Sequence, residues 1–135
     1  KLAELASFKT MKMAIEEACE DVKKQHQRVN EMYELLGSKA SDEGCEVVKA
    51  VIEEAYNLST KDGKPTIVND MDIILYMQMI ENIEFTSFRM LKLINQFLGD
   101  DEITQLLAEC CDENMDNSNL FGLISEEYLA QKALG

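Results

Sequence analysis

Glu81 and Glu84 are the residues of this sequence best placed to do chemistry. Side chains three positions apart on a helix lie on one face, so both carboxylates can point toward the same site. Glu113 and Asp116 repeat this spacing further along the chain. Glutamates that project inward from several helices of a bundle are the ligands of dimetal-carboxylate centres. The spacing therefore predicts a metal site, provided that helices bring these acids together.

Three long stripes of apolar residues at heptad spacing must position these acids. Each stripe is interrupted near its middle by polar side chains: Gln25 in the first, Glu81 and Glu84 in the second and Glu113 in the third. Asp21 lies one turn before Gln25 and borders the first stripe. An isolated buried carboxylate is expensive unless it is paired, protonated or bound to a metal. We therefore expect the interruptions to share one polar layer inside the bundle.

The predicted metal ligands are Asp21, Glu81, Glu84 and Glu113, with Gln25 completing the layer. Such a set of oxygen donors favours hard cations or manganese over zinc and holds iron less well than a site with imidazole. Iron or manganese is the cofactor expected for a dimetal site. Imidazole is missing, because the single histidine, His26, lies one residue off its stripe and is expected at the surface. A second interpretation stays open, since a polar residue in a seam can instead fix the register of a bundle.

Composition and charge narrow the function classes. Acidic residues outnumber basic residues 26 to 13, and the net charge of −13 argues against nucleic acid and anionic membranes as partners. No run approaches the ~18 apolar residues of a membrane span, and the first residues show no signal-peptide pattern, so we expect a cytoplasmic protein. The four cysteines lack the paired spacing of a zinc site and are expected to be reduced core residues.

The pattern predicts a single all-α domain over residues 1–135, with almost no strand. Gly37 is expected to cap the first long helix, and Asp100 or Asp101 the last. The methionines at helical spacing are expected to fill the core. The long connection from 37 to 66 can cross the bundle, as in ferritin-like topologies. We expect one helix that ends at residue 6. Further helices are expected over about 9–36, 45–58, 66–98 and 101–133.

Three segments resemble the ferritin-like family of uncharacterised bacterial proteins typified by the stress protein YciF. They are residues 31–37 (EMYELLG), 45–54 (CEVVKAVIEE) and 81–84 (ENIE). The resemblance implies a ferritin-like four-helix bundle whose first helix is represented here only by its tail, residues 1–6. Where the family typically has Glu-His-Tyr-Glu, this chain keeps Glu81 and Glu84 but lacks the histidine. The last helix matches the family around Glu109 and Glu113.

Two functional hypotheses follow. The first is a cytoplasmic, stress-related protein, with a homodimer as the expected assembly, whose polar layer binds a pair of metal ions. The second is a non-catalytic structural or protein-interaction bundle that has lost metal binding. The sequence predicts no catalytic residue, since no nucleophile motif or phosphate-binding loop occurs, and a non-enzymatic role is favoured over an oxidase-type activity.

Overall fold

A computed structural model describes residues 2–41, 46–60 and 67–134 of the chain. These ranges contain helices and no strand, which confirms the all-α prediction. Their bounds agree with the expected ranges to within about two residues. The helices are α1 (Leu2–Leu5), α2 (Lys9–Leu35), α3 (Glu46–Thr60), α4 (Ile67–Leu98) and α5 (Asp101–Leu134).

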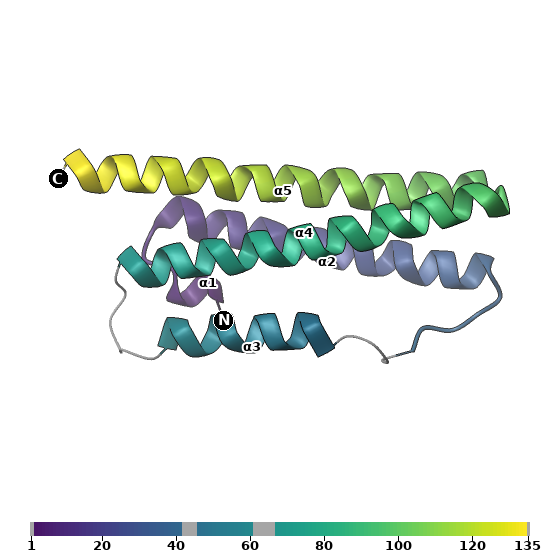
Figure 1. The fold of residues 1–135 in the computed structure, drawn as a ribbon, viewed down its shortest axis with the longest axis horizontal. Coiled ribbons are helices and arrows are strands. Elements are labelled where there is room, and N and C mark those ends of the chain that lie inside the picture. Colours follow the sequence, from purple (N-terminus) through teal and green to yellow (C-terminus); the bar gives the residue numbers. More distant parts are fainter. Residues whose placement is uncertain (1, 42–45, 61–66, 135) are drawn as a thin grey trace.

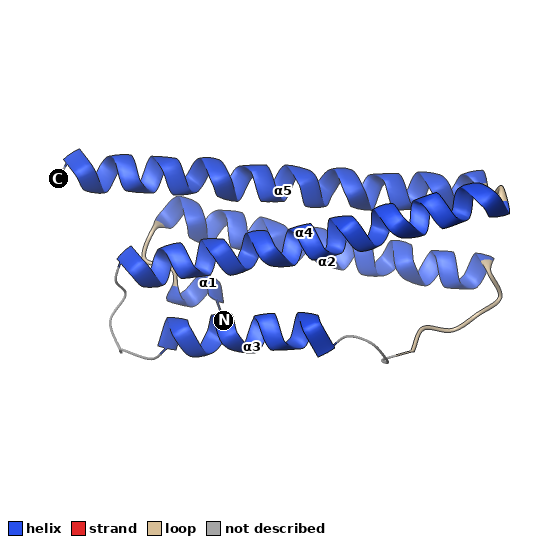
Figure 2. Cartoon of the chain, in the orientation of Figure 1, coloured by secondary structure: helices blue, strands red, loops and turns tan. Residues whose placement is uncertain are grey.

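The three long helices lie along the long axis of the molecule (Figure 1). Helices α2 and α4 run in the same direction and α5 runs in the opposite one, packed against both (Figure 2). Two parallel helices require a connection that returns along the bundle, and α3 lies on that return, against the first half of α4. The predicted long crossover with a short helix is therefore confirmed.

Local chemistry explains where the long helices end. Gly37 has a positive φ of 61° and its N–H donates to the carbonyl of Glu34, while Ser38 N–H donates to Tyr33, as in a Schellman cap. Gly99, with φ of 77°, turns the chain between α4 and α5. Asp100 then caps α5, because its Oδ1 accepts a hydrogen bond of 3.0 Å from the N–H of Ile103.

Two apolar clusters form the core. The smaller lies toward the α4–α5 turn and contains Met32, Ile103 and Leu107. The larger lies toward the opposite end, where α1 and the start of α2 pack. Its buried members are Met11, Ala14, Ile15, Ala18, Ile73, Ile74, Met77, Phe121 and Ile124. The polar interruptions of the three stripes fall in sequence between these clusters.

Some predictions about burial are wrong. Cys19 is exposed, whereas Cys110 and Cys111 are buried as expected, and all three are free thiols; Cys45 lies outside the described residues. Burial raises the pKa of Cys110 to about 11, which keeps this thiol protonated. Met13 and Met79 are exposed by 58% and 40% rather than buried in the core. Periodicity shows which residues share a face, but not whether another element covers that face.

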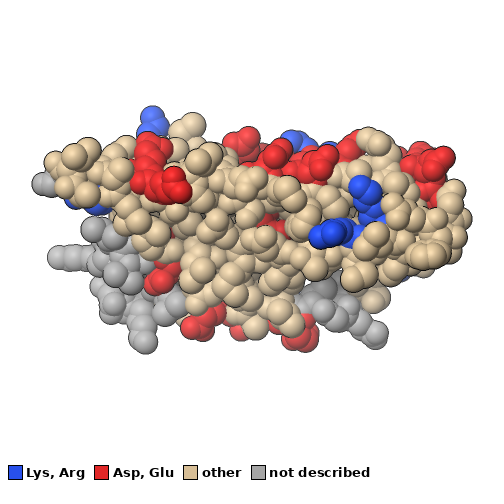
Figure 3. Space-filling view, turned by 45° about the horizontal axis from the view of Figure 1, so that its top comes forward, with Lys and Arg blue, Asp and Glu red and all other residues tan. Residues whose placement is uncertain are grey.

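The charge is unevenly distributed over the surface. On the face drawn in Figure 3, acidic side chains line the upper edge and a further group lies at the lower edge. Uncharged residues fill most of the middle, with a small group of basic side chains toward one end. On this face, most acidic side chains therefore lie along its borders.

Candidate functional site

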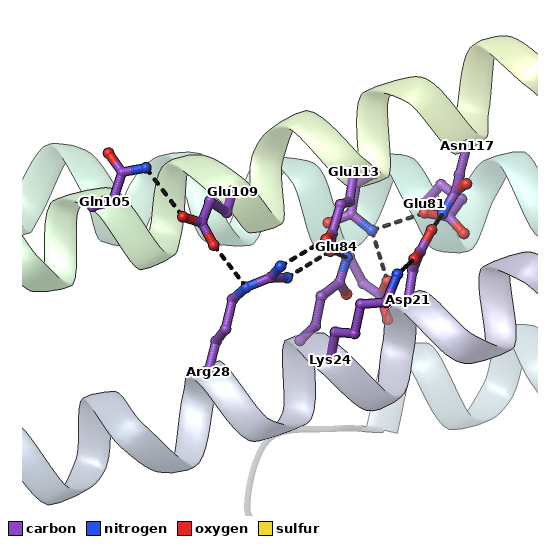
Figure 4. A network of polar contacts seen from close by, with 11 residues as sticks. Asp21, Lys24, Arg28, Glu81, Glu84, Gln105, Glu109, Glu113 and Asn117 are labelled. Carbon is purple, nitrogen blue, oxygen red and sulfur yellow. Dashed lines mark hydrogen bonds and ion pairs between the residues drawn. The ribbon is translucent and has the colours of Figure 1, made fainter.

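Helices α2, α4 and α5 bring the polar interruptions together in one layer (Figure 4). Hydrogen bonds join α5 to α4 and to α2 at this level. The prediction of a shared polar layer is confirmed, and the layer is larger than expected because two asparagines of α5 belong to it. Its members are Asp21, Gln25, Glu81, Glu84, Glu113, Asn114 and Asn117.

Glu81, Glu84 and Asn114 form the inner part of the layer. The amide Nδ2 of Asn114 donates to Glu81 Oε2 at 2.8 Å and to Glu84 Oε2 at 3.0 Å. Glu81 is only 2% exposed and Asn114 is fully buried, while Glu84 is half-buried. The Oδ1 atom of Asn114 has no hydrogen-bond partner among the described residues. Two carboxylates thus share one amide, and an acceptor beside them is left unsatisfied.

Burial dominates the electrostatics of this pair. It raises the pKa of Glu81 to about 7, with the nearby Glu84 raising it further and the hydrogen bond from Asn114 opposing both. The pKa of Glu84 is also raised, again by burial and against the hydrogen bond from Asn114. Near neutral pH, Glu81 is therefore protonated in a substantial fraction of molecules.

Glu113 is engaged differently, by a guanidinium group. Arg28 donates from Nη1 and Nη2 to the two carboxylate oxygens of Glu113, at 2.7 and 2.8 Å. Arg28 Nε also lies 3.0 Å from an oxygen of Glu109, which in turn accepts a hydrogen bond from Gln105. The pKa of Arg28 is raised, mainly by its hydrogen bonds to Glu113. Planar, bidentate pairing of this kind fixes geometry as well as charge.

Asp21 lies at the edge of the layer. It accepts a hydrogen bond of 3.3 Å from Asn117 on α5, and its other oxygen lies 2.7 Å from Nζ of Lys24. The Asp21 side chain is 13% exposed and that of Lys24 is 57% exposed, so this ion pair is partly solvated. Asp21 therefore links α2 to α5 across the rim of the layer.

The four predicted metal ligands do not form one ligand set as placed. Glu81 and Glu84 come together, but Glu113 is held by Arg28 and Asp21 by Lys24. Across residues 2–41, 46–60 and 67–134, no three side chains of the His, Cys, Asp or Glu type gather as a metal site would require. His26 is exposed and lies 3.3 Å from the amide of Asn30, as expected for a surface residue. Metal binding stays a prediction.

Arg28 is the residue of this layer that the sequence analysis missed. The signal was available, because Asp21, Gln25 and Arg28 follow one another at steps of four and three on one face of α2. A charged residue beside an apolar stripe is usually read as solvated, so the position was not assigned to the interior. Arg28 is in fact only 18% exposed.

A second polar cluster, also missed, lies near the other end of the bundle. Asp70 on α4 is fully buried. It accepts hydrogen bonds from the backbone N–H of Ser7 at 3.0 Å, from the hydroxyl of Ser7, and from the hydroxyl of Tyr128 at 2.6 Å. This cluster ties the α1–α2 turn to the first part of α4 and the last part of α5.

Comparison with known proteins shows the family. The chain matches the family described as a domain of unknown function (DUF892) over residues 1–134, and it belongs to that family. A search of curated protein sequences finds no significant match. Within the described part of the chain, no helix combines the length and the apolar content needed to cross a bilayer.

Two solved structures share the fold. The Escherichia coli stress protein YciF is 22% identical, with a TM-score of 0.88 over 96% of this chain and 81% of its own. YcfI, described as a putative structural protein from Rhodopseudomonas palustris, is also 22% identical, with a TM-score of 0.82 over 90% of this chain and 76% of its own. The resemblance to a YciF-like family predicted from the sequence is confirmed.

Proposed function

We propose that this protein is a non-catalytic structural bundle whose polar layer fixes the register of its helices. The supporting observation is that the acids of the layer are held across helices by donors of the same chain. Asn114 of α5 joins Glu81 and Glu84 of α4, and Arg28 of α2 holds Glu113 of α5. The description of YcfI as a putative structural protein agrees with this role.

The geometry of the Arg28–Glu113 pair explains why such a layer specifies register. Apolar stripes with several small side chains, such as Ala14 and Ala18, tolerate sliding of one helix past another. A slip of one turn moves a side chain by about 5.4 Å, which separates both atoms of a bidentate pair from their partners. The same slip leaves the buried Asn114 amide without its two acceptors. Only one register satisfies the layer.

The test replaces the inner layer by apolar residues. A triple variant with Glu81→Met, Glu84→Leu and Asn114→Leu removes the buried polar groups, so its melting temperature is expected to hold or rise. The variant is expected to lose its single well-ordered packing of helices. Its amide NMR resonances should then broaden, and a hydrophobic dye should bind. Asn119→Leu, at an exposed position of α5, is the control. Sharp resonances and no dye binding in the triple variant would contradict the proposed role.

A second candidate function, binding of iron or manganese, rests on the inner pair alone. Glu81 and Glu84 lie beside the unpartnered Oδ1 of Asn114, which is an oxygen donor set of the kind that hard cations prefer. Elemental analysis of native protein should then show metal that the Glu81→Gln, Glu84→Gln variant lacks. Glu126→Gln with Glu127→Gln is the control of equal charge, on an exposed part of α5. Equal and negligible metal in all three proteins removes this candidate.

The proposal also covers the physiological role, the cellular location and the oligomeric state of the protein. The solved neighbour named as a stress protein supports a stress-related role, and the acidic composition supports a protein that avoids nucleic acid. A cytoplasmic location is part of the same proposal. We place a homodimer in the same proposal. Abundance measured before and after oxidative, osmotic and starvation stress tests the first point, and an unchanged level in all three conditions would contradict it.

A further inference from the structure

Charge is balanced differently at the outer acids and at the inner pair of the polar layer. Glu113 is paired with the guanidinium group of Arg28, and both side chains are labelled in Figure 4. Asp21 is paired in the same way with the ammonium group of Lys24. Within the part of the chain that the structure describes, no Lys or Arg side chain forms an ion pair with either glutamate of the inner pair. The amide group of Asn114 stands there instead.

This amide bridges the inner pair in the way that a cation would. Nδ2 of Asn114 lies 2.8 Å from Oε2 of Glu81 and 3.0 Å from Oε2 of Glu84. An amide nitrogen carries two hydrogen atoms, so one group can donate to both carboxylates at once. A metal ion that bridges the same two oxygen atoms has to lie between them, where Nδ2 lies now. The amide and a metal ion therefore compete for one position.

The orientation of the amide strengthens this competition. With Nδ2 facing the carboxylates, Oδ1 of Asn114 is buried on the other side and has no partner among the described residues. A metal ion takes oxygen ligands, so the amide would have to rotate by about 180° to offer Oδ1 to a cation at the inner pair. That rotation gives up both hydrogen bonds of an amino group in a fully buried side chain, which is costly.

A second asparagine shows the contrast within the same layer. Asn117 lies one turn after Asn114 on α5, and its Nδ2 donates to Asp21 at 3.3 Å. Asp21 also has Lys24 at 2.7 Å, so the amide of Asn117 accompanies a cation. The amide of Asn114 has no such companion and bridges two acids by itself.

We propose that Asn114 sets the cation affinity of the polar layer, because its amide holds the bridging position between Glu81 and Glu84 and keeps the binding of divalent cations weak. This role goes beyond the fixing of register, since it names the residue that prevents the inner pair from acting as a metal site. The second candidate function needs the opposite orientation of the same amide. One titration therefore separates the two.

Asn114→Asp tests the competition by a gain of binding. The variant replaces the bridging amino group by a third carboxylate of nearly the same size, so the inner pair loses its competitor and gains a ligand. Isothermal titration calorimetry with Mn²⁺ is expected to show binding at least about tenfold tighter than in the wild type, because the charge of the ligands sets the affinity of such sites. The melting temperature of this variant is expected to rise on addition of Mn²⁺.

The matched control is Asn119→Asp, at an exposed position of α5. It adds the same charge outside the layer and is expected to titrate like the wild type. Tighter binding by Asn119→Asp equal to that of Asn114→Asp would assign the gain to net charge and overturn the proposal.

Asn114→Ala decides the question if three buried acids prevent Asn114→Asp from folding. It removes the bridging donor without adding a charge, so Mn²⁺ is expected to bind more tightly than to the wild type. Glu81→Gln and Glu84→Gln, added to Asn114→Ala, are expected to abolish that gain. A folded Asn114→Ala that binds Mn²⁺ no better than the wild type overturns the proposal, because the amide then does not compete with the cation.

Discussion

The two polar clusters of the bundle treat buried carboxylates in opposite ways. Asp70 is fully buried and accepts three hydrogen bonds, two from Ser7 and one from Tyr128. Glu81 and Glu84 together share the single amide nitrogen of Asn114. The first cluster directs three hydrogen bonds to one carboxylate, whereas the second directs one amide group to two carboxylates.

This difference separates a purely structural link, the Asp70 cluster, from a site that can still bind a further group, the Glu81–Glu84 cluster. The donors of Asp70 come from two distant parts of the chain and are fully used, so the cluster can do little except hold those parts together. In the second cluster the pKa of Glu81 is raised to about 7, and Asn114 Oδ1 has no partner in the described residues. A proton, a water molecule or a cation would each satisfy that cluster better than its own side chains do.

Asp70→Ala should have the largest effect. It leaves the buried hydroxyl of Tyr128 without an acceptor, at about 1–3 kcal/mol, and removes two hydrogen bonds from the exposed Ser7, at about 0.5–1.5 kcal/mol each. We expect the free energy of unfolding to fall by roughly 4 kcal/mol in urea denaturation. Asp116→Ala, at an exposed position of α5, is the control and should change it by less than about 0.5 kcal/mol. A loss below about 1 kcal/mol for Asp70→Ala would show that the Asp70 cluster is not a strong structural link.

Glu81→Gln tests the Glu81–Glu84 cluster through the pH dependence of the free energy of unfolding. The folded pKa of Glu81 is about 7, above its unfolded value of 4.5, so stability from this group is present at low pH and lost as pH rises between these values. The full shift would correspond to roughly 3 kcal/mol, and we expect about 2 kcal/mol after relaxation of the site. At pH 8 the variant should be more stable than the wild type by that amount.

The control for this prediction is the same comparison at low pH. At pH 5 both folded proteins carry an uncharged side chain at position 81 and only the unfolded wild type is ionised there, so their free energies of unfolding should differ by less than about 1 kcal/mol. Taking the difference between the two proteins also cancels the repulsion from the net charge of −13, which changes with pH in both. A difference that is the same at pH 5 and pH 8 would show that Glu81 is ionised throughout.

The sequence could predict the helices and the polar layer because both depend on local spacing. Gly37, Asp100 and the interruptions at Gln25 and Glu81 are visible as patterns along the chain. The Asp70 cluster is not visible in this way, since Ser7 and Tyr128 lie 63 and 58 residues away from Asp70. Only packing brings these groups together.

The limits of periodicity also explain the errors of burial. Leu91 and Leu98 continue the apolar stripe that Glu81 and Glu84 interrupt, yet they are exposed by 50% and 70%. The stripe is regular over its whole length, but α3 covers only the first half of α4. Arg28 shows the converse limit, because a charged residue next to a stripe gives no sign that it is only 18% exposed. Spacing defines a face, and a neighbouring element decides whether that face is buried.

Arg28→Met tests whether the layer gains stability from its one bidentate ion pair. The Arg28 and Glu113 side chains are 18% and 22% exposed, so solvent screens them only partly, and we expect a loss of about 1.5 kcal/mol. A double-mutant cycle with Glu113→Gln should show a coupling energy of about 1 kcal/mol. The exposed pair Lys23–Glu20, at 68% and 64%, is the control and should show almost none. Equal coupling energies in both pairs would show that the Arg28–Glu113 pair contributes no more stability than an exposed ion pair.

Tyr128→Phe should have the smallest effect and is the finest test of the comparison. Burial, followed by the neighbouring Asp70, raises the pKa of Tyr128 to about 12, so its hydroxyl stays a donor at every pH at which the protein is handled. The variant removes one donor and leaves Asp70 with both hydrogen bonds from Ser7, so urea denaturation should show a loss of about 1 kcal/mol. Tyr33→Phe, at a half-buried position of α2, serves as control. If Tyr128→Phe instead destabilises the protein as much as Asp70→Ala, the two hydrogen bonds from Ser7 do not compensate for the lost donor. The two clusters would then differ in how deeply they are buried rather than in their number of hydrogen bonds.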